Sequence, residues 1–222
     1  MVCKHLKCQI IFISIIAIFQ YISAADSSWY LPIKLHDRQS LENVKLTQIG
    51  PFGLVRKARP GVPSHLHTGI DFRRPSDNYD DEPEYPASRG VVISLRSDGP
   101  FAQIIVEHRL NDSVKVWTVY EHIAGIMATL GDTVSPDKPM GRFMTKKELD
   151  KYGWQFDHLH FEVMKKSPVV LKPERRNPFR RFNTYALTCY TKKELDKVYY
   201  DPREFLKSIW RRASLSDDDK MK

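Results

Sequence analysis

Residues 101–123, FAQIIVEHRLNDSVKVWTVYEHI, decide the fold class of this chain. The runs Phe101 to Arg109 and Val114 to Ile123 are rich in β-branched and aromatic residues, which favour extended strands. Asn111-Asp112 supplies a turn between them, and a further alternating run, Val91 to Arg96, precedes them. Strands at this short spacing pair with their neighbours in sequence, so we expect an antiparallel meander and a mainly β fold.

A few peripheral helices are expected after this β region. Thr145-Lys-Lys-Glu148 is a capping box, in which threonine and glutamate satisfy the free N–H groups of a helix start. Asp201-Pro202 opens a second helix with an apolar stripe that docks on the domain. The stripe consists of Phe205, Leu206, Ile209 and Trp210. The heptapeptide TKKELDK occurs twice, at 145–151 and 191–197, which is too little to indicate a repeat array.

Residues 1–25 have the pattern of an export signal. Lys4 and Lys7 precede an apolar run, Ile10 to Phe19, and Ser23-Ala24-Ala25 offers small residues for cleavage. The run is too short to cross a hydrocarbon layer of about 30 Å, so a cleaved signal is favoured over a retained anchor. We therefore expect an exported protein with no stable membrane span after cleavage.

The remainder of the chain divides into three predicted parts. Residues 26–49 form an irregular lead-in, 50–165 the β domain, and 166–222 a C-terminal extension with the docking helix and a disordered tail. Loss of the two signal lysines lowers the net charge from +8 to +6. A basic exported protein suits an anionic partner such as wall polymer or a membrane surface. Nucleic acid is excluded as a partner, because the basic residues are scattered and no nucleic-acid motif is present.

Cysteine use is consistent with a fold without internal disulfides. Cleavage removes Cys3 and Cys8 and leaves Cys189, which has no partner for a disulfide. Cys189 is either a reactive thiolate or a small buried apolar residue, and the second interpretation is favoured.

Histidines and carboxylates alternate with apolar residues at three places. In His67-Thr-Gly-Ile-Asp71, residues 67, 69 and 71 share one face of an extended chain, and Gly69 leaves space between the polar pair. His158, His160 and Glu162 likewise share a face, and Tyr120 and His122 are expected on one side of a third strand. Zinc in a hydrolytic site takes three such ligands and leaves a fourth position for water. Spacing alone leaves ordinary strand histidines open as the alternative.

The order of several motifs is more specific than any one of them. Residues 51–72 (Pro51-Phe-Gly53, Arg56 and His67-Thr-Gly-Ile-Asp71-Phe) resemble the opening motif of the LytM and lysostaphin family of zinc peptidoglycan endopeptidases. Residues 85–92, Tyr120-Glu-His122, Gly131-Asp-Thr-Val134, Gly141 and His158-Leu-His160-Phe-Glu-Val163 are similar to the elements that follow in that family. The resemblance covers about residues 51–164.

The resemblance implies a LytM-like antiparallel two-sheet domain with a metal-binding groove. It implies that His67, Asp71 and His160 bind Zn²⁺, that His158 is the general base, and that His122 stabilises the oxyanion. Tyr120 would line the substrate groove, and the substrate would be an amide in peptidoglycan stem or cross-bridge peptides.

Two segments depart from the family pattern. Residues 76–84 contain an acidic insertion, and 144–157 replace the glycine-rich loop that borders the groove, which puts substrate choice in doubt. Two alternatives are kept. One is a non-catalytic LytM-like protein that binds wall or regulates another hydrolase. The other is a wall-binding module with a purely structural metal.

Overall fold

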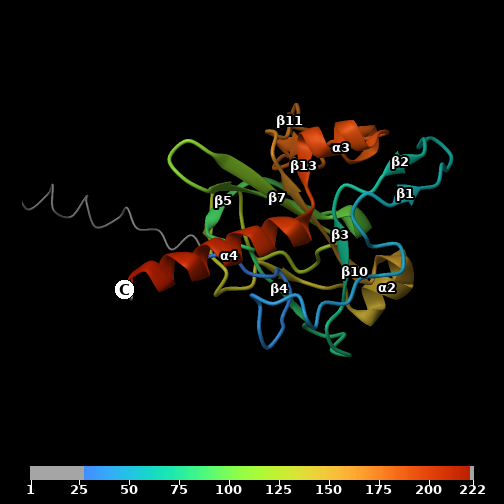
Figure 1. The fold of residues 1–222 in the computed structure, drawn as a ribbon. Helices are drawn as coiled ribbons and strands as arrows, with labels where there is room; N and C mark the ends of the chain where they lie inside the picture. The colour runs from blue at the N-terminus through green and yellow to red at the C-terminus, as the bar shows by residue number, and fades with distance from the viewer. Residues whose placement is uncertain (1–27, 221–222) are drawn as a thin grey trace, which may run out of the picture.

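The computed structural model describes residues 28–220, so the predicted signal, residues 1–25, lies outside the described residues. A seven-stranded antiparallel sheet forms the centre of the domain (Figure 1). Its strand order is β13-β10-β7-β6-β5-β8, and β3 also pairs with β10. The strands are β3 (Ile70–Arg73), β5 (Gly90–Arg96), β6 (Gln103–Arg109), β7 (Lys115–Glu121), β8 (Thr133–Val134), β10 (His158–Met164) and β13 (Tyr199–Tyr200).

Three two-stranded antiparallel sheets surround the central one. They pair β1 (Val55–Arg56) with β2 (His65–Leu66), β4 (Pro83–Glu84) with β9 (Gly141–Arg142), and β11 (Val169–Val170) with β12 (Phe182–Asn183). The consecutive pairing of β5, β6 and β7 is the predicted meander. The prediction of a mainly antiparallel β fold is therefore confirmed.

Both copies of the duplicated heptapeptide start a short helix. The helices are α2 (Lys146–Tyr152) and α3 (Lys192–Val198), and both have complete capping boxes, at Thr145 and Thr191. Each helix also buries its leucine, Leu149 or Leu195. Each copy of the heptapeptide therefore forms the same local structure. It caps the N-terminus of a short helix and buries one leucine in the core. Within residues 28–220 there are also three 3₁₀ turns: η1 (Gly99–Phe101), η2 (Trp154–Phe156) and η3 (Ala186–Thr188).

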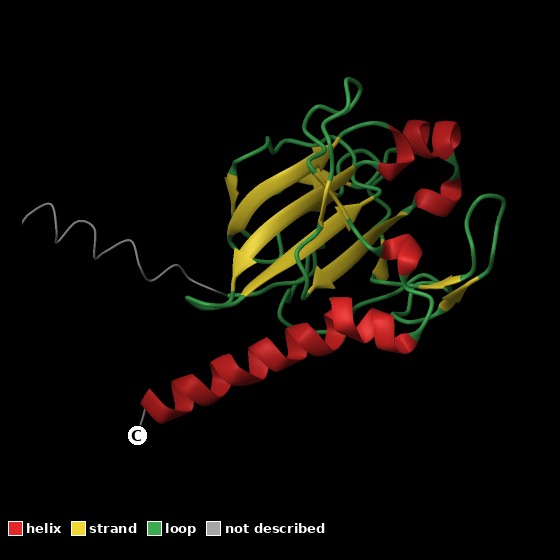
Figure 2. Ribbon diagram, turned by 90° about the horizontal axis from the view of Figure 1, so that it is seen from above, coloured by secondary structure: helices red, strands yellow, loops and turns green. Residues whose placement is uncertain are grey.

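The last helix, α4 (Pro202–Lys220), crosses one face of the domain (Figures 1 and 2). It begins at the predicted proline, and Phe205 and Leu206 of its apolar stripe are buried. The helix continues through most of the segment predicted to be a disordered tail, because no proline or glycine interrupts it. Within residues 28–220, no helix combines the length and the apolar character needed to span a membrane.

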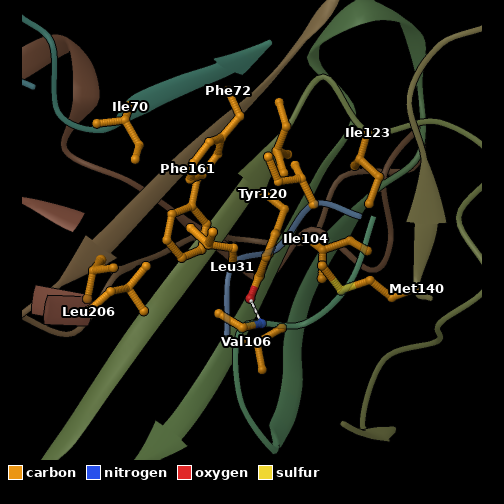
Figure 3. Packing of buried hydrophobic residues seen from close by; sticks show 14 of the residues in the cluster. Leu31, Ile70, Phe72, Ile104, Val106, Tyr120, Ile123, Met140, Phe161 and Leu206 are labelled. Carbon is orange, nitrogen blue, oxygen red and sulfur yellow. Dashed lines mark hydrogen bonds between the residues drawn. The ribbon is translucent and has the colours of Figure 1, made fainter. Parts of the chain in front are cut away.

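The hydrophobic core lies on both faces of the central sheet. On one face, Tyr120 and Phe161 pack with Leu206 of α4 (Figure 3). The irregular lead-in joins this cluster, since Trp29, Leu31 and Ile33 are buried in it. On the other face, a smaller cluster lies beneath α3 and includes Trp117, Val119, Cys189 and Leu195. The lead-in is therefore irregular in backbone but is part of the core.

Candidate metal centre and groove

Two neighbouring strands bring the predicted metal ligands together. Asp71 on β3 lies directly opposite His160 on β10 in the antiparallel register, and the chain just after β2 adds His67. His160 Nδ1 lies 2.9 Å from Asp71 Oδ1, and His67 Nε2 lies 3.0 Å from both of these atoms. The three side chains therefore direct one donor atom each to a common point.

Each of these side chains also has a second polar partner that fixes its orientation. His67 Nδ1 donates to the Pro51 carbonyl oxygen at 3.0 Å, which leaves Nε2 without a proton in the neutral ring. Asp71 Oδ2 accepts from Arg56 Nη2 at 2.7 Å. His160 Nε2 lies 3.2 Å from Glu162 Oε1, which also accepts a hydrogen bond from the Thr68 hydroxyl. Such partners fix the orientation and basicity of metal ligands.

The donor set fits a zinc ion. Zn–N and Zn–O bonds of about 2.0–2.1 Å in a tetrahedron place ligand atoms about 3.3 Å apart. The observed separations of 2.9–3.0 Å are close to this value. The electrostatics also favour a positive charge there. Burial lowers the pKa of His160, but hydrogen bonds with Asp71 and Glu162 outweigh it and raise that pKa to about 10.

Two further histidines lie beside the three donors. His158 Nε2 is 3.7 Å from Asp71 Oδ1, and the His122 ring is 4.7 Å from the His158 ring, edge to face. Burial lowers the pKa of His158 to about 3, and burial also lowers the pKa of His122. Both rings are therefore neutral at pH 7, the form in which an imidazole can accept a proton.

His122 reaches the site through an unusual backbone conformation. It follows the end of β7 with a φ of 69°, and within residues 28–220 it is the one residue other than glycine with positive φ. Its Nδ1 donates to the Pro100 carbonyl oxygen at 2.5 Å, so Nε2 is the ring nitrogen left for the groove. Strained residues of this kind occur at functional sites when surrounding contacts hold them in place.

Tyr120 does not line the groove, and this prediction is wrong. On β7 it pairs with Phe161 on β10, which places it on the core face (Figure 3). Its hydroxyl accepts from the Ala87 N–H at 2.8 Å. Glu121 is the β7 residue on the groove face, opposite His160. The sequence suggested that Tyr120 and His122 share a side, but the left-handed backbone at His122 breaks the alternation.

The space predicted at Gly69 is filled by a neighbouring strand. A Cβ atom there would lie 2.4 Å from the Phe161 carbonyl oxygen and 2.9 Å from its carbonyl carbon. Glycine therefore lets the chain between His67 and Asp71 approach the backbone of β10 closely enough to complete the donor set.

A groove of about 410 Å³ opens above the donors. The groove is lined by His65, His67, Asp71, His122, His158 and His160. The sequence reasoning did not identify other lining residues, because they come from loops without a motif. They include Ile49 from the lead-in, Lys57 and Arg59 from the β1–β2 hairpin, Phe101 and Phe156 from η1 and η2, and Leu187 from η3.

The two departures from the family pattern pack against each other beside this groove. Arg74 forms an ion pair with Asp157 at 2.8 Å and donates a hydrogen bond to the Met144 carbonyl oxygen. It therefore contacts both the first and the last residue of the replaced loop, 144–157. Tyr79 of the acidic insertion contacts Trp154 of η2 edge to face, with ring centres 5.8 Å apart. The replaced loop is thus held in place, and it contributes Phe156 to the groove.

Several other titratable residues lie outside the groove. His108 is buried and hydrogen-bonded to the Arg89 carbonyl and to Thr118, as expected of a structural histidine. Cys189 is buried, and burial raises the pKa of its thiol to about 11, which disfavours a reactive thiolate. His36 and the basic cluster at 175–181 do not line the groove.

Comparisons with known proteins add a similarity of fold. No protein-family model and no curated protein matches the chain. The catalytic domain of the antimicrobial peptidase lysostaphin from Staphylococcus simulans is 23% identical, over 78% of this chain and 99% of that one, with a TM-score of 0.44. A zinc-containing peptidase from Vibrio cholerae is 22% identical over 63% of this chain, with a TM-score of 0.42.

This chain spans only 37% of the Vibrio cholerae peptidase. A structure of the SpoIIIAH and SpoIIQ complex is also similar, with 20% identity over 62% of this chain and 92% of that one and a TM-score of 0.43. At these identities the similarity concerns the fold alone. The solved structures to which the chain is similar thus include lysostaphin, the type of peptidase that its sequence motifs resemble.

Proposed function

We propose that this protein is a zinc-dependent endopeptidase that hydrolyses amide bonds in peptidoglycan stem or cross-bridge peptides. The observation that carries the proposal is the convergence of His67, Asp71 and His160 on one point at the floor of an open groove, with His122 and His158 beside them. A zinc ion bound there supplies a Lewis acid and lowers the pKa of a coordinated water to about 7.

The other two histidines have complementary roles in this proposal. His158 is neutral and next to the donors, so its Nε2 can accept a proton from the attacking water. His122 presents Nε2 to the groove and stabilises the oxyanion once that nitrogen carries a proton, because Nδ1–H is already bonded to Pro100.

The alternative without catalysis is a wall-binding or regulatory protein of the same fold. Such a protein has no need of His122 and His158 beside the donors, nor of a strained backbone at His122. A purely structural metal is disfavoured for a related reason. A structural zinc site has four protein ligands, whereas the group found within residues 28–220 has three.

The proposed setting is the outside of the cell. An export signal at residues 1–25 and a basic chain suit a protein that acts on an anionic wall polymer.

The test is zinc content together with cleavage of purified peptidoglycan by residues 26–222. We expect one zinc per chain and new free peptide ends. The His160→Ala variant should lose both, and His158→Ala should keep zinc but lose cleavage. Bound zinc without cleavage in the unaltered protein would favour the wall-binding alternative, and absence of zinc binding would reject the metal site.

A further inference from the structure

The β1–β2 hairpin places two unpaired cations along the groove. Lys57 and Arg59 are exposed and line it, and neither forms an ion pair with any residue in the described range 28–220. The turn that carries them is well ordered by hydrogen bonds. Arg59 and Val62 exchange two backbone hydrogen bonds of 2.9 Å, and Gly61 between them has a φ of 76°. Arg59 is therefore the first residue of a hydrogen-bonded turn, and Lys57 lies two residues before it on the same hairpin.

The other charges of the groove already have partners or lie elsewhere. Arg56, on the same hairpin, is neutralised by Asp71 at 2.7 Å. Glu121 accepts from the Gln103 amide at 2.6 Å and lies on β7, opposite His160. The hairpin side of the groove thus carries positive charge at Lys57 and Arg59 that no ion pair compensates among the residues that the structure describes.

The His122 side of the groove has the opposite character. The rings of Phe101 and Phe156 pack edge to face at 5.4 Å, and both contact the His122 ring, at 5.9 Å and 5.0 Å. A carboxylate placed against these rings would lose hydration without gaining a partner, whereas the faces of aromatic rings attract cations, as Arg96 over Phe101 shows. The groove therefore combines an aromatic wall beside His122 with the two cations of the hairpin.

We propose that the groove selects peptides that carry a carboxylate on the hairpin side of the cleaved bond, with Lys57 and Arg59 as the groups that bind it. The guanidinium of Arg59 can bind a carboxylate through two parallel hydrogen bonds, and Lys57 adds a second charge. The proposal rests on the proposed peptidase function and makes its substrate class more specific. The carboxylate comes either from an acidic side chain or from the end of the peptide.

Three matched peptides test the proposal with the zinc-loaded protein. The first carries an acidic side chain and a free C-terminus on the hairpin side. The second has the side-chain carboxylate replaced by its amide, and the third has an amidated C-terminus. We expect kcat/KM to fall about two- to fivefold for whichever peptide lacks the bound carboxylate, since exposed ion pairs contribute on this scale. The preference should shrink in high salt.

Two double variants assign the effect to the hairpin. Lys57→Gln/Arg59→Gln should abolish the preference through KM and leave kcat nearly unchanged, because these residues bind substrate and do not touch the cleaved bond. Lys172→Gln/Arg175→Gln removes the same charges from an exposed segment outside the groove and should keep the preference.

The outcomes separate the two proposals. Cleavage of all three peptides at equal rates would reject the carboxylate preference and leave the peptidase function standing. A preference that survives in the Lys57→Gln/Arg59→Gln variant would reject the hairpin as its source. Absence of cleavage of every peptide would reject the peptidase function, and the preference with it.

Discussion

Arg56 Nη2 lies 2.7 Å from Asp71 Oδ2, on the side of the carboxylate that faces away from His67 and His160. Burial alone would raise the pKa of Asp71, but hydrogen bonds with His160 and His67 hold it well below the usual range. Asp71 is therefore ionised at neutral pH, and Arg56 fixes which oxygen points to the proposed metal.

We predict that Arg56→Met weakens zinc binding about 10- to 100-fold, as expected when the partner of a metal ligand is removed. Competition with a chelator of known affinity measures the change. Arg175→Met, which removes a guanidinium far from the donors, should bind zinc as the unaltered protein does. Unchanged affinity in Arg56→Met would show that Asp71 needs no orienting partner.

His122 provides a test of backbone strain. Both His122→Ala and His122→Gly remove the ring and its contacts, and we predict a loss of roughly a hundredfold or more in turnover for each. Their stabilities should differ, because glycine tolerates the φ of 69° and alanine does not. We expect the glycine variant to be more stable by about 1 kcal/mol in urea unfolding. An alanine variant of equal or greater stability would mean that residue 122 is not strained.

Gly69 should tolerate no side chain. In Gly69→Ala the new methyl group meets the Phe161 backbone at 2.4 Å, so β3 and β10 must separate. We predict a loss of about 1–3 kcal/mol in the free energy of unfolding, together with weaker zinc binding. Gly131→Ala is the control, since nothing lies within 4 Å of a Cβ there and its φ of 90° adds only backbone strain. Normal zinc binding in Gly69→Ala would contradict the close approach.

The two capping boxes allow a matched comparison. Thr145→Ala and Thr191→Ala should each destabilise the protein by about 1 kcal/mol, the usual value for a lost N-cap. Only α2 leads into η2, which carries Phe156 to the groove. We therefore expect KM to rise in Thr145→Ala alone. Equal effects of the two variants on KM would show that the loop at 144–157 does not contribute to substrate binding.

His108 should make stability depend on pH. Burial lowers its pKa from 6.5 to about 4, so the unfolded chain binds a proton at a higher pH than the folded protein does. Above pH 6.5 the neutral His108 ring does not reduce the free energy of unfolding. As the pH falls from 6.5 towards 4, we expect this free energy to decrease by about 3 kcal/mol. Urea unfolding at several pH values, compared with His108→Gln, isolates this contribution. If the free energy of unfolding changes with pH in the same way in both proteins, His108 is not the source of the pH dependence.

Local sequence determined much of the architecture. Alternation along His158–Val163 placed Phe161 in the core and His160 at the site, and the capping box at Thr145 marked a helix that the structure contains. These features depend on neighbours a few residues away, and such signals can be read along the chain.

Features that depend on distant contacts could not be predicted. The sequence pattern did not reveal that Arg56 binds Asp71 or that the lead-in carries Trp29 into the core. Tyr120 was assigned to the wrong face because the change in backbone direction at His122 has no sequence marker. The positions of Phe101 and Phe156 depend on loops that resemble no motif.

Trp29 and Phe205 pack edge to face with ring centres 4.9 Å apart, and Trp210 Nε1 donates to the Trp29 carbonyl oxygen at 2.8 Å. One of the first described residues is thus covered by the last helix. During synthesis, the contact between Trp29 and α4 cannot form until Phe205 has been made, so this part of the core stays incomplete for most of the time that the chain is growing. This layer of the core therefore closes only when nearly all of the described chain has been made.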